Sequence, residues 1–140
     1  ELSEVIFEQT GGNNDFAVIR SRGDQALFGK STQAMKAQWK VPDTRPLADF
    51  APTILLKAKD FATEITIFNA RQHGMHTQDT ITREHVTNNS AVRQTLIQRG
   101  IRPENLPPDE DVKKLERRLA SEDKKTLKNT QALGPKNTKD

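Results

Sequence analysis

Apolar residues recur between positions 47 and 68 at alternating spacings of four and three. We call this set the apolar seam, and it consists of Leu47, Ala51, Ile54, Ala58, Phe61, Ile65 and Phe68. Such spacing is the a/d pattern of a helix that packs along one face. Pro52 interrupts the pattern early, because proline lacks an amide hydrogen and clashes with the preceding turn. The pattern therefore predicts a short helix, a kink at Ala51–Pro52 and a long central helix that ends at about Arg71.

The apolar seam needs a packing partner, and the chain offers few. Hydrophobic residues make up 33% of the sequence, whereas roughly 45–50% is typical of globular domains. We therefore expect Phe61, Ile65 and Phe68 to be the most buried part of the seam, with Ala51 and Ala58 at close helix contacts. The alternative is that the seam faces a second copy or another partner, and Phe61 is then exposed in the isolated chain.

Glycines and capping residues divide the N-terminal part of the chain into two helices. The first helix, 1–10, ends at the Gly-Gly pair 11–12. The second begins at the Asn-Asn pair 13–14, whose side chains can accept hydrogen bonds from free helical amides. Gly23 and Gly29 are expected to lie in the loop that follows this helix.

A third helix is expected between Ser31 and Pro42. Ser31 is a suitable N-cap, and Pro42 ends the helix because the residue before a proline is pushed out of the α region. Met35 and Trp39 are four residues apart and share one face. This spacing favours burial of both side chains.

The C-terminal part contains two more expected helices and a tail. One helix is capped by Thr80 or Thr82 and ends at Gly100, with Ile101 folding back in a Schellman motif. Another spans 109–120, and the Lys-, Thr- and Asn-rich residues 121–140 are expected to be disordered and flexible. The predicted fold class is all-α: about five helices around one long kinked central helix, in a domain of residues 1–120.

Positive charge is concentrated in the first half of the chain. The net charge is only +3, but between Arg20 and Lys59 cations clearly outnumber acids. Such a stretch is compatible with phosphate binding, although an ordinary solvated surface is slightly favoured. Trp39 could stack on an unpaired base, but burial in the core is the favoured interpretation. The candidate nucleic-acid contacts are Lys36, Trp39, Lys40, Arg45, Lys57 and Lys59.

Metal binding is weighed against ordinary solvation for the three histidines. His73, His76 and His85 occur near Asp79 and Glu84, which are ligand types that zinc accepts. No H-E-x-x-H pattern is present, and His73 and His76 flank a glycine. We interpret the histidines as solvated and expect no metal site.

Enzymatic chemistry finds little support in the sequence. The chain contains no cysteine, which excludes thiol catalysis and disulfides and fits a reducing compartment. The segment "GDQALFGKST" is one residue too long for a phosphate loop, and no strand precedes it. The acids of "PDEDV" suit a helix start better than a nuclease site. We expect no enzyme activity and no cofactor.

Four segments resemble a known family in the same order along the chain. They are "NNDFAVIRSRGDQALFG", "KVPDTRPLADFAPTILLKAKDFATEITIFNA", "ITREHVTNNSAVRQTLIQRGIRPENLPP" and "DEDVKKLERR". The "DF" opening, the "LFG" turn, the "KAKDFATE" helix and the "VR..L...G..PE.LPP" ending carry the similarity. Together they resemble the C-terminal half of DNA-damage-inducible protein D (DinD) and related prophage antirepressor-type proteins.

The resemblance implies a process rather than a chemistry. Full-length relatives carry an N-terminal domain of the phage antirepressor (BRO-like) type that this sequence lacks, and the chain begins at Glu1. We therefore expect it to be a piece of a longer protein. The family is associated with the SOS response and recombinase-dependent repair, and it implies no established catalytic residues.

The expected function is that of a non-catalytic regulatory domain in the cytoplasm. Its expected partners are a recombinase filament, single-stranded DNA and a second copy of the chain. The alternative is an oligomerisation or repressor-binding domain of an antirepressor-type transcriptional regulator, and a metal-dependent nuclease is a distant third. A membrane location is not expected, because no apolar run approaches the roughly 20 residues that a spanning helix needs.

Overall fold

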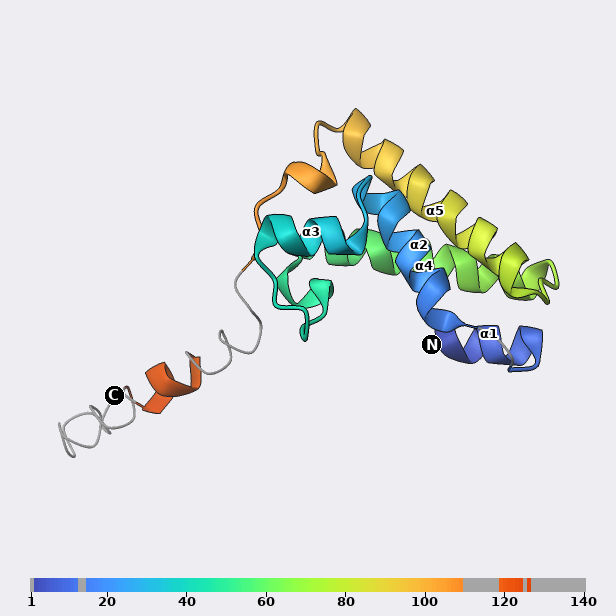
Figure 1. Ribbon diagram of the computed structural model, residues 1–140, viewed down its shortest axis with the longest axis horizontal. Coiled ribbons are helices and arrows are strands. Elements are labelled where there is room, and N and C mark those ends of the chain that lie inside the picture. The colour runs from blue at the N-terminus through green and yellow to red at the C-terminus, as the bar shows by residue number, and fades with distance from the viewer. Residues whose placement is uncertain (1, 13–14, 110–118, 125, 127–140) are drawn as a thin grey trace, which may run out of the picture. The chain divides into compact units, whose positions relative to one another are not determined.

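A computed structural model of the protein describes residues 2–12, 15–109, 119–124 and 126. The chain divides into two compact units, 1–108 and 109–140, and the fold described below is that of the first. The described residues contain helices and no strand, so the all-α prediction is confirmed. In chain order the elements are α1 (Leu2–Thr10), α2 (Phe16–Phe28), α3 (Thr32–Trp39), the 3₁₀ helix η1 (Leu47–Phe50), α4 (Thr53–Gln72), α5 (Gln78–Gln98) and the 3₁₀ helix η2 (Pro103–Asn105) (Figure 1).

The second unit is described only at Asp109, 119–124 and 126. Residues 119–124 and 126 are helical. Most of the predicted helix 109–120, and most of the tail 121–140, lie outside the described residues. The flexibility of the tail therefore stays a prediction.

Side-chain caps begin three of the helices. Asp15 caps α2 by accepting a hydrogen bond from the Val18 amide at 3.3 Å, and Ser31 caps α3 as predicted, accepting from Ala34 at 3.1 Å. Thr77 rather than Thr80 or Thr82 caps α5, because its hydroxyl oxygen accepts the Thr80 amide at 3.1 Å. Each cap satisfies an amide that the first helical turn leaves free.

The loop predicted around Gly23 is wrong. Helix α2 continues through Gly23 to Phe28 and ends only at Gly29, which adopts a left-handed φ of 71°. Gly23 is retained inside the helix because another helix approaches its backbone closely, as described below. Sequence reasoning treated both glycines as helix breakers, whereas only one of them is.

Helix α5 ends as predicted. Gly100 has a φ of 82°, and the Ile101 amide donates to the Leu96 carbonyl at 2.8 Å. This long bond back over the last turn is the defining bond of a Schellman motif. It turns the chain sharply into the segment that leads to η2.

Pro52 separates two elements instead of kinking one helix. The 3₁₀ helix η1 ends at Phe50, and Ala51 is extended, with φ −76° and ψ 135°. Helix α4 then begins at Thr53, directly after the proline. The predicted short helix is therefore the 3₁₀ helix η1, the predicted kink at Ala51–Pro52 is a break with Ala51 extended, and the predicted long helix is α4, which ends at Gln72.

Helix α5, rather than α4, is the central element of the fold. It packs along α2 and along α4 and also contacts α1, whereas α4 packs mainly against α5 and α1 (Figure 1). The sequence therefore predicted the range of this long helix correctly, but the prediction that it is the central helix of the fold is wrong. The buried side of α5 therefore packs against both α2 and α4.

The predicted burial of the apolar seam is confirmed for Ala51 and Ala58 but wrong for its two phenylalanines, and Ile65 is only half-buried. Phe61 is 62% exposed and Phe68 is 65% exposed, and Ile54 is 42% exposed. The buried side of α4 consists instead of mostly small residues, namely Leu55, Ala58, Ala62, Thr66, Ile67 and Ala70. Small side chains let the backbone of α5 come close, so the phenylalanines are left on a different side of the helix.

Three apolar clusters form the core. One joins α1 to the C-terminal half of α4, and its buried members are Leu2, Val5, Ile6, Ile19, Ile67, Ala70 and Ile81. A second surrounds α3 and η1 and consists of Phe28, Met35, Trp39, Val41, Leu47, Ala51 and Leu55. A third, smaller cluster joins Leu27, Ala58, Ala62 and Val92.

Among the described residues, no helix combines the length and apolar character that crossing a membrane requires.

Candidate nucleic-acid interface

Cations from three helices line one groove on the first unit. We call it the basic groove and define it by Arg20 and Asp24 of α2, Lys36 of α3 and Lys59 of α4. It has two adjoining hollows of about 370 and 250 Å³, and Arg20, Asp24 and Lys59 line both of them. The fold therefore brings together cations that are far apart in the sequence.

Two of the groove's charges are paired across helices. Lys59 Nζ lies 3.2 Å from Asp24 Oδ1, and this ion pair fastens α4 to α2. Both side chains are largely shielded from solvent, so water screens the pair less than it would an exposed pair. Because one acid faces three cations, the groove keeps a net positive charge.

Arg20 and Lys36 supply the open charges of the groove. The Arg20 guanidinium carbon lies over the Phe16 ring, 4.6 Å from its centre, and this cation–π contact attracts the charge to the aromatic side chain. Lys36 Nζ donates one hydrogen bond to the Asp43 carbonyl at 3.4 Å. An ammonium has three donors, so Lys36 can still bind an anion.

Three of the predicted nucleic-acid contacts, Lys40, Arg45 and Lys57, lie outside the basic groove. Lys40 and Lys57 are exposed, but neither lines the basic groove. Arg45 binds the Asp49 carboxylate at 2.6 Å and lies over the Phe50 ring at 5.6 Å. Of the six residues predicted from the sequence, only Lys36 and Lys59 line the groove.

Trp39 belongs to the core, as the favoured interpretation held. It is 6% exposed, and its indole N–H donates to the Leu106 carbonyl at 3.0 Å. The Phe28 ring meets it edge-on with centroids 5.7 Å apart. Neither face of the indole is therefore open for a base to stack on.

Arg20 is the groove residue that sequence reasoning missed. It was counted among the cations of the basic stretch but not among the candidate contacts. A usable signal was present, because Phe16 and Arg20 are four residues apart and so lie on the same face of a helix. Helical spacing alone, however, does not show that α3 and α4 bring Lys36 and Lys59 to that face.

A buried polar layer forms the floor of the smaller hollow. We define it as Thr66 of α4 with His85, Asn88 and Asn89 of α5, and His85 and Asn89 line the hollow. A hydrogen bond of 2.8 Å joins Thr66 Oγ1 and His85 Nδ1. Asn88 donates to Thr66 Oγ1 at 3.0 Å and to the Glu84 carboxylate at 2.7 Å. The polar layer thus separates two apolar clusters along the same helices.

His85 is not a solvated residue, so its predicted exposure is wrong. It is only 4% exposed. Burial lowers the pKa of His85 below its ordinary value, and the nearby Lys59 ammonium acts in the same direction. The carboxylates of Asp24 and Glu84 oppose this shift without reversing it. The imidazole is therefore neutral near pH 7, which suits its place in a hydrogen-bonded core.

Gly23 makes room for the polar layer. A Cβ atom at this position would lie 2.4 Å from His85 Cδ2 and 3.0 Å from the amide nitrogen of Asn89. Both distances are too short for ordinary packing, so any larger residue must push α2 and α5 apart. This close approach explains why a glycine stands in the middle of α2.

The histidines are not brought together. His73 is exposed, and His76 is exposed with its Nδ1 2.9 Å from the Gln9 carbonyl oxygen. His85 lies in the buried polar layer. Among the described residues, no three His, Asp or Glu side chains are grouped closely enough to hold a metal ion.

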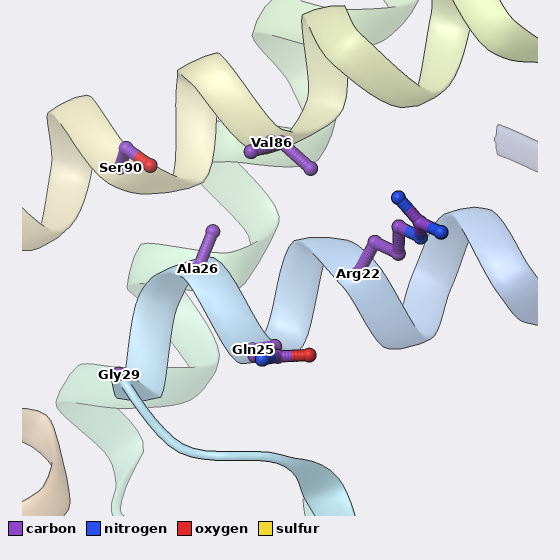
Figure 2. Close-up of a pocket in the computed structure, with 6 residues that line it drawn as sticks. All are labelled: Arg22, Gln25, Ala26, Gly29, Val86 and Ser90. Atoms are coloured by element: carbon purple, nitrogen blue, oxygen red, sulfur yellow. The ribbon is translucent and has the colours of Figure 1, made fainter.

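A third, wider hollow of about 670 Å³ lies between α2 and α5. Figure 2 shows Arg22 and Ala26 of α2 pointing toward α5, with Val86 and Ser90 on the facing side of α5. Within the described part of the chain, Arg22 is the one charged residue that lines this hollow. It is therefore a weaker candidate for an anion than the basic groove.

The "VR..L...G..PE.LPP" motif has a structural role in this fold. Arg93 binds the Glu104 carboxylate at 2.6 Å and donates to the Leu27 carbonyl at 3.0 Å. Its guanidinium lies against Gly29, where a Cβ would be only 2.9 Å away. The motif thus ties η2 and the end of α2 to α5, and it explains the glycine of the "LFG" turn.

Comparison with known proteins assigns most of the chain to a family. A family model described as the DinD C-terminal domain matches residues 7–115. This range extends from the middle of α1 into the second unit and covers the basic groove, the polar layer and the Arg93–Glu104 pair. No curated protein and no solved structure matches the chain. The resemblance identified from the sequence motifs is therefore confirmed at the level of the family.

Proposed function

The chain belongs to the family of DinD C-terminal domains, and we propose that it is a non-catalytic interaction domain in the response to DNA damage. It would regulate recombinational repair by contacting single-stranded DNA together with the recombinase filament formed on it. The sequence resemblance set out above associates such domains with the SOS response and recombinase-dependent repair. The basic groove supplies a surface on which a phosphate backbone can bind.

The convergence of Arg20, Lys36 and Lys59 in one groove is the observation that carries this proposal. Single-stranded nucleic acids are commonly bound by a cationic groove combined with planar groups on which bases stack. The Arg20 guanidinium, which lies over the Phe16 ring, is such a planar group. Lys36 would then contact a phosphate beside it, while Lys59, paired with Asp24, adds its charge to the wall of the groove.

Binding of a fluorescently labelled oligothymidine, measured by anisotropy at several salt concentrations, tests the proposal. Affinity should fall steeply with salt, because each phosphate contact on a single strand contributes about −0.7 to the logarithmic slope. Arg20→Ala and Lys36→Ala should each weaken binding and reduce the slope by about one such contact. No binding to the wild-type chain at low salt would overturn the proposal.

Arg22→Ala is the matched control for Arg20→Ala. The two arginines belong to the same helix and carry the same charge, but Arg22 lines the hollow between α2 and α5. Binding should therefore be nearly unchanged in the Arg22 variant. An equal loss in both variants would mean that net charge, rather than the groove, determines binding.

An antirepressor-type role in oligomerisation or repressor binding is the second candidate. The exposed phenylalanines of α4 favour it, since unpaired aromatic side chains commonly mark protein contacts. Pull-down of a repressor by the chain from cell extract, lost on substitution of Phe61, would support this role. Retention of a recombinase in the same experiment supports the first candidate.

A further inference from the structure

One side of α4 presents large apolar residues that the first unit does not cover. We call it the outer face of α4 and define it by Ile54, Lys57, Phe61, Glu64 and Phe68. Its apolar members are 42%, 62% and 65% exposed in chain order. They follow one another at intervals of seven residues, so they stand in a row about 10 Å apart, since each residue advances a helix by about 1.5 Å.

The charged members of the outer face alternate with the apolar ones. Lys57 lies between Ile54 and Phe61, and Glu64 lies between Phe61 and Phe68. Both are exposed, and neither forms an ion pair within the described part of the chain. The row therefore presents opposite charges on the two sides of Phe61.

This order of charges selects the orientation of a second copy. In a parallel pair of α4 helices, Lys57 would face Lys57 and Glu64 would face Glu64, and both contacts are repulsive. In an antiparallel pair centred on Phe61, Lys57 of one copy lies beside Glu64 of the other, and the symmetry makes this contact twice. Ile54 and Phe68 are each seven residues from Phe61, so they face each other in the same arrangement.

We propose that the outer face of α4 binds the same face of a second copy of this chain, antiparallel, with the two-fold axis at Phe61. A face that complements itself in this way is what an isologous dimer requires. A hollow of about 390 Å³ beside Phe68, lined by Glu64, Ile67, Arg71 and Gln72, receives Ile54 of the second copy. This dimer does not depend on the nucleic-acid function proposed above.

Sedimentation velocity of the whole chain over a range of micromolar concentrations gives the first test. The contact is small compared with a standard interface, so the expected dimer dissociates in the micromolar range. Phe61→Glu places two like charges at the two-fold axis and should leave only monomer. Since Phe61 is 62% exposed, thermal unfolding at low concentration should show that the variant still folds.

Charge reversal tests the orientation. Lys57→Glu alone and Glu64→Lys alone should each weaken the dimer at least tenfold, because each puts like charges side by side. The double variant should restore it. An equimolar mixture of the two single variants should also dimerise, because each chain then supplies the charge that the other needs. A parallel dimer would differ at the single variants, because it places like charges together in the wild type, in each single variant and in the double variant. Neither single change would then weaken it.

Val18→Glu is the control, since Val18 is an exposed apolar residue of α2 that lies outside the outer face. It should dimerise like the wild type. A wild-type chain that stays monomeric at all concentrations overturns the proposal and assigns the outer face to a different partner. A dimer that survives Phe61→Glu overturns it as well, because another surface then holds the copies together.

Discussion

The two sides of α4 differ in a way that reverses the usual expectation about large and small residues. The inner side packs against the rest of the fold with Ala58, Ala62, Thr66 and Ala70, whereas the outer face carries two phenylalanines and an isoleucine. Small residues give the close helix contact in which backbone, rather than side-chain bulk, fills the space. Hydrophobic bulk is therefore a poor guide to which side of this helix is the core.

Enlarging the inner side should have the largest effect. Ala62 is fully buried, so Ala62→Leu forces α4 away from its neighbours and should lower the free energy of unfolding by about 3 kcal/mol. Urea unfolding followed by circular dichroism measures this change. Phe61→Leu, which introduces the same residue one position earlier, should leave stability nearly unchanged.

Removing the one hydroxyl of the inner side should cost less. Thr66→Val keeps the shape of the side chain but deprives His85 and Asn88 of a buried hydrogen-bond partner. The expected loss is about 2 kcal/mol in the same unfolding experiment, in the range found for buried groups left unsatisfied. Thr95→Val is the control. The Thr95 hydroxyl donates to the Ala91 carbonyl at 3.2 Å, as the Thr66 hydroxyl donates to the Ala62 carbonyl at 3.0 Å, but Thr95 is exposed. Equal losses in the two variants would contradict a special role for the polar layer.

Acidification should lower the free energy of unfolding, because protonation of His85 disrupts the polar layer. Burial lowers the pKa of His85 in the folded chain, so the unfolded chain binds the proton more readily. Stability is then complete well above the ordinary histidine pKa of about 6.5 and declines as the pH falls through it. The decline levels off below the folded pKa. Melting temperatures measured across this range should show the loss, and His85→Asn should reduce it.

Truncation on the outer face should have the smallest effect. Phe61→Ala should change the free energy of unfolding by no more than about 0.5 kcal/mol, as expected for an exposed site. A core phenylalanine would instead cost about 3–5 kcal/mol. Urea unfolding of this variant should be measured at a protein concentration at which the chain is monomeric. A loss of several kcal/mol there would restore the original prediction that the apolar seam is the core.

Local signals made parts of the fold predictable. The Ser31 cap, the Schellman end at Gly100 and the paired burial of Met35 and Trp39 all depend on residues within about six positions of one another. Helix α4 was located for the same reason, since Pro52 marks its start. Capping and helical periodicity are properties of a short segment, so a sequence displays them directly.

Other features depend on contacts between distant segments. Residues spaced by three and four occur on both sides of α4, and the sequence offers no local reason to prefer the side with Ala62 over the side with Phe61. Gly23 resembles a helix breaker until His85, 62 positions later, is found against it. The basic groove likewise requires three helices to meet, so only two of its three cations were among the predicted contacts.

The burial of Trp39 provides the protein with an intrinsic optical probe. Trp39 is the only tryptophan in the chain, and its indole is bonded to Leu106 in the segment that the Arg93–Glu104 pair fastens down. Indole fluorescence moves to longer wavelength when water replaces a buried environment. The emission maximum therefore reports on residues 101–108, and circular dichroism recorded beside it separates their detachment from the unfolding of α2, α4 and α5. Detachment of this segment by Glu104→Gln would appear as a red shift while the helical circular dichroism stays intact.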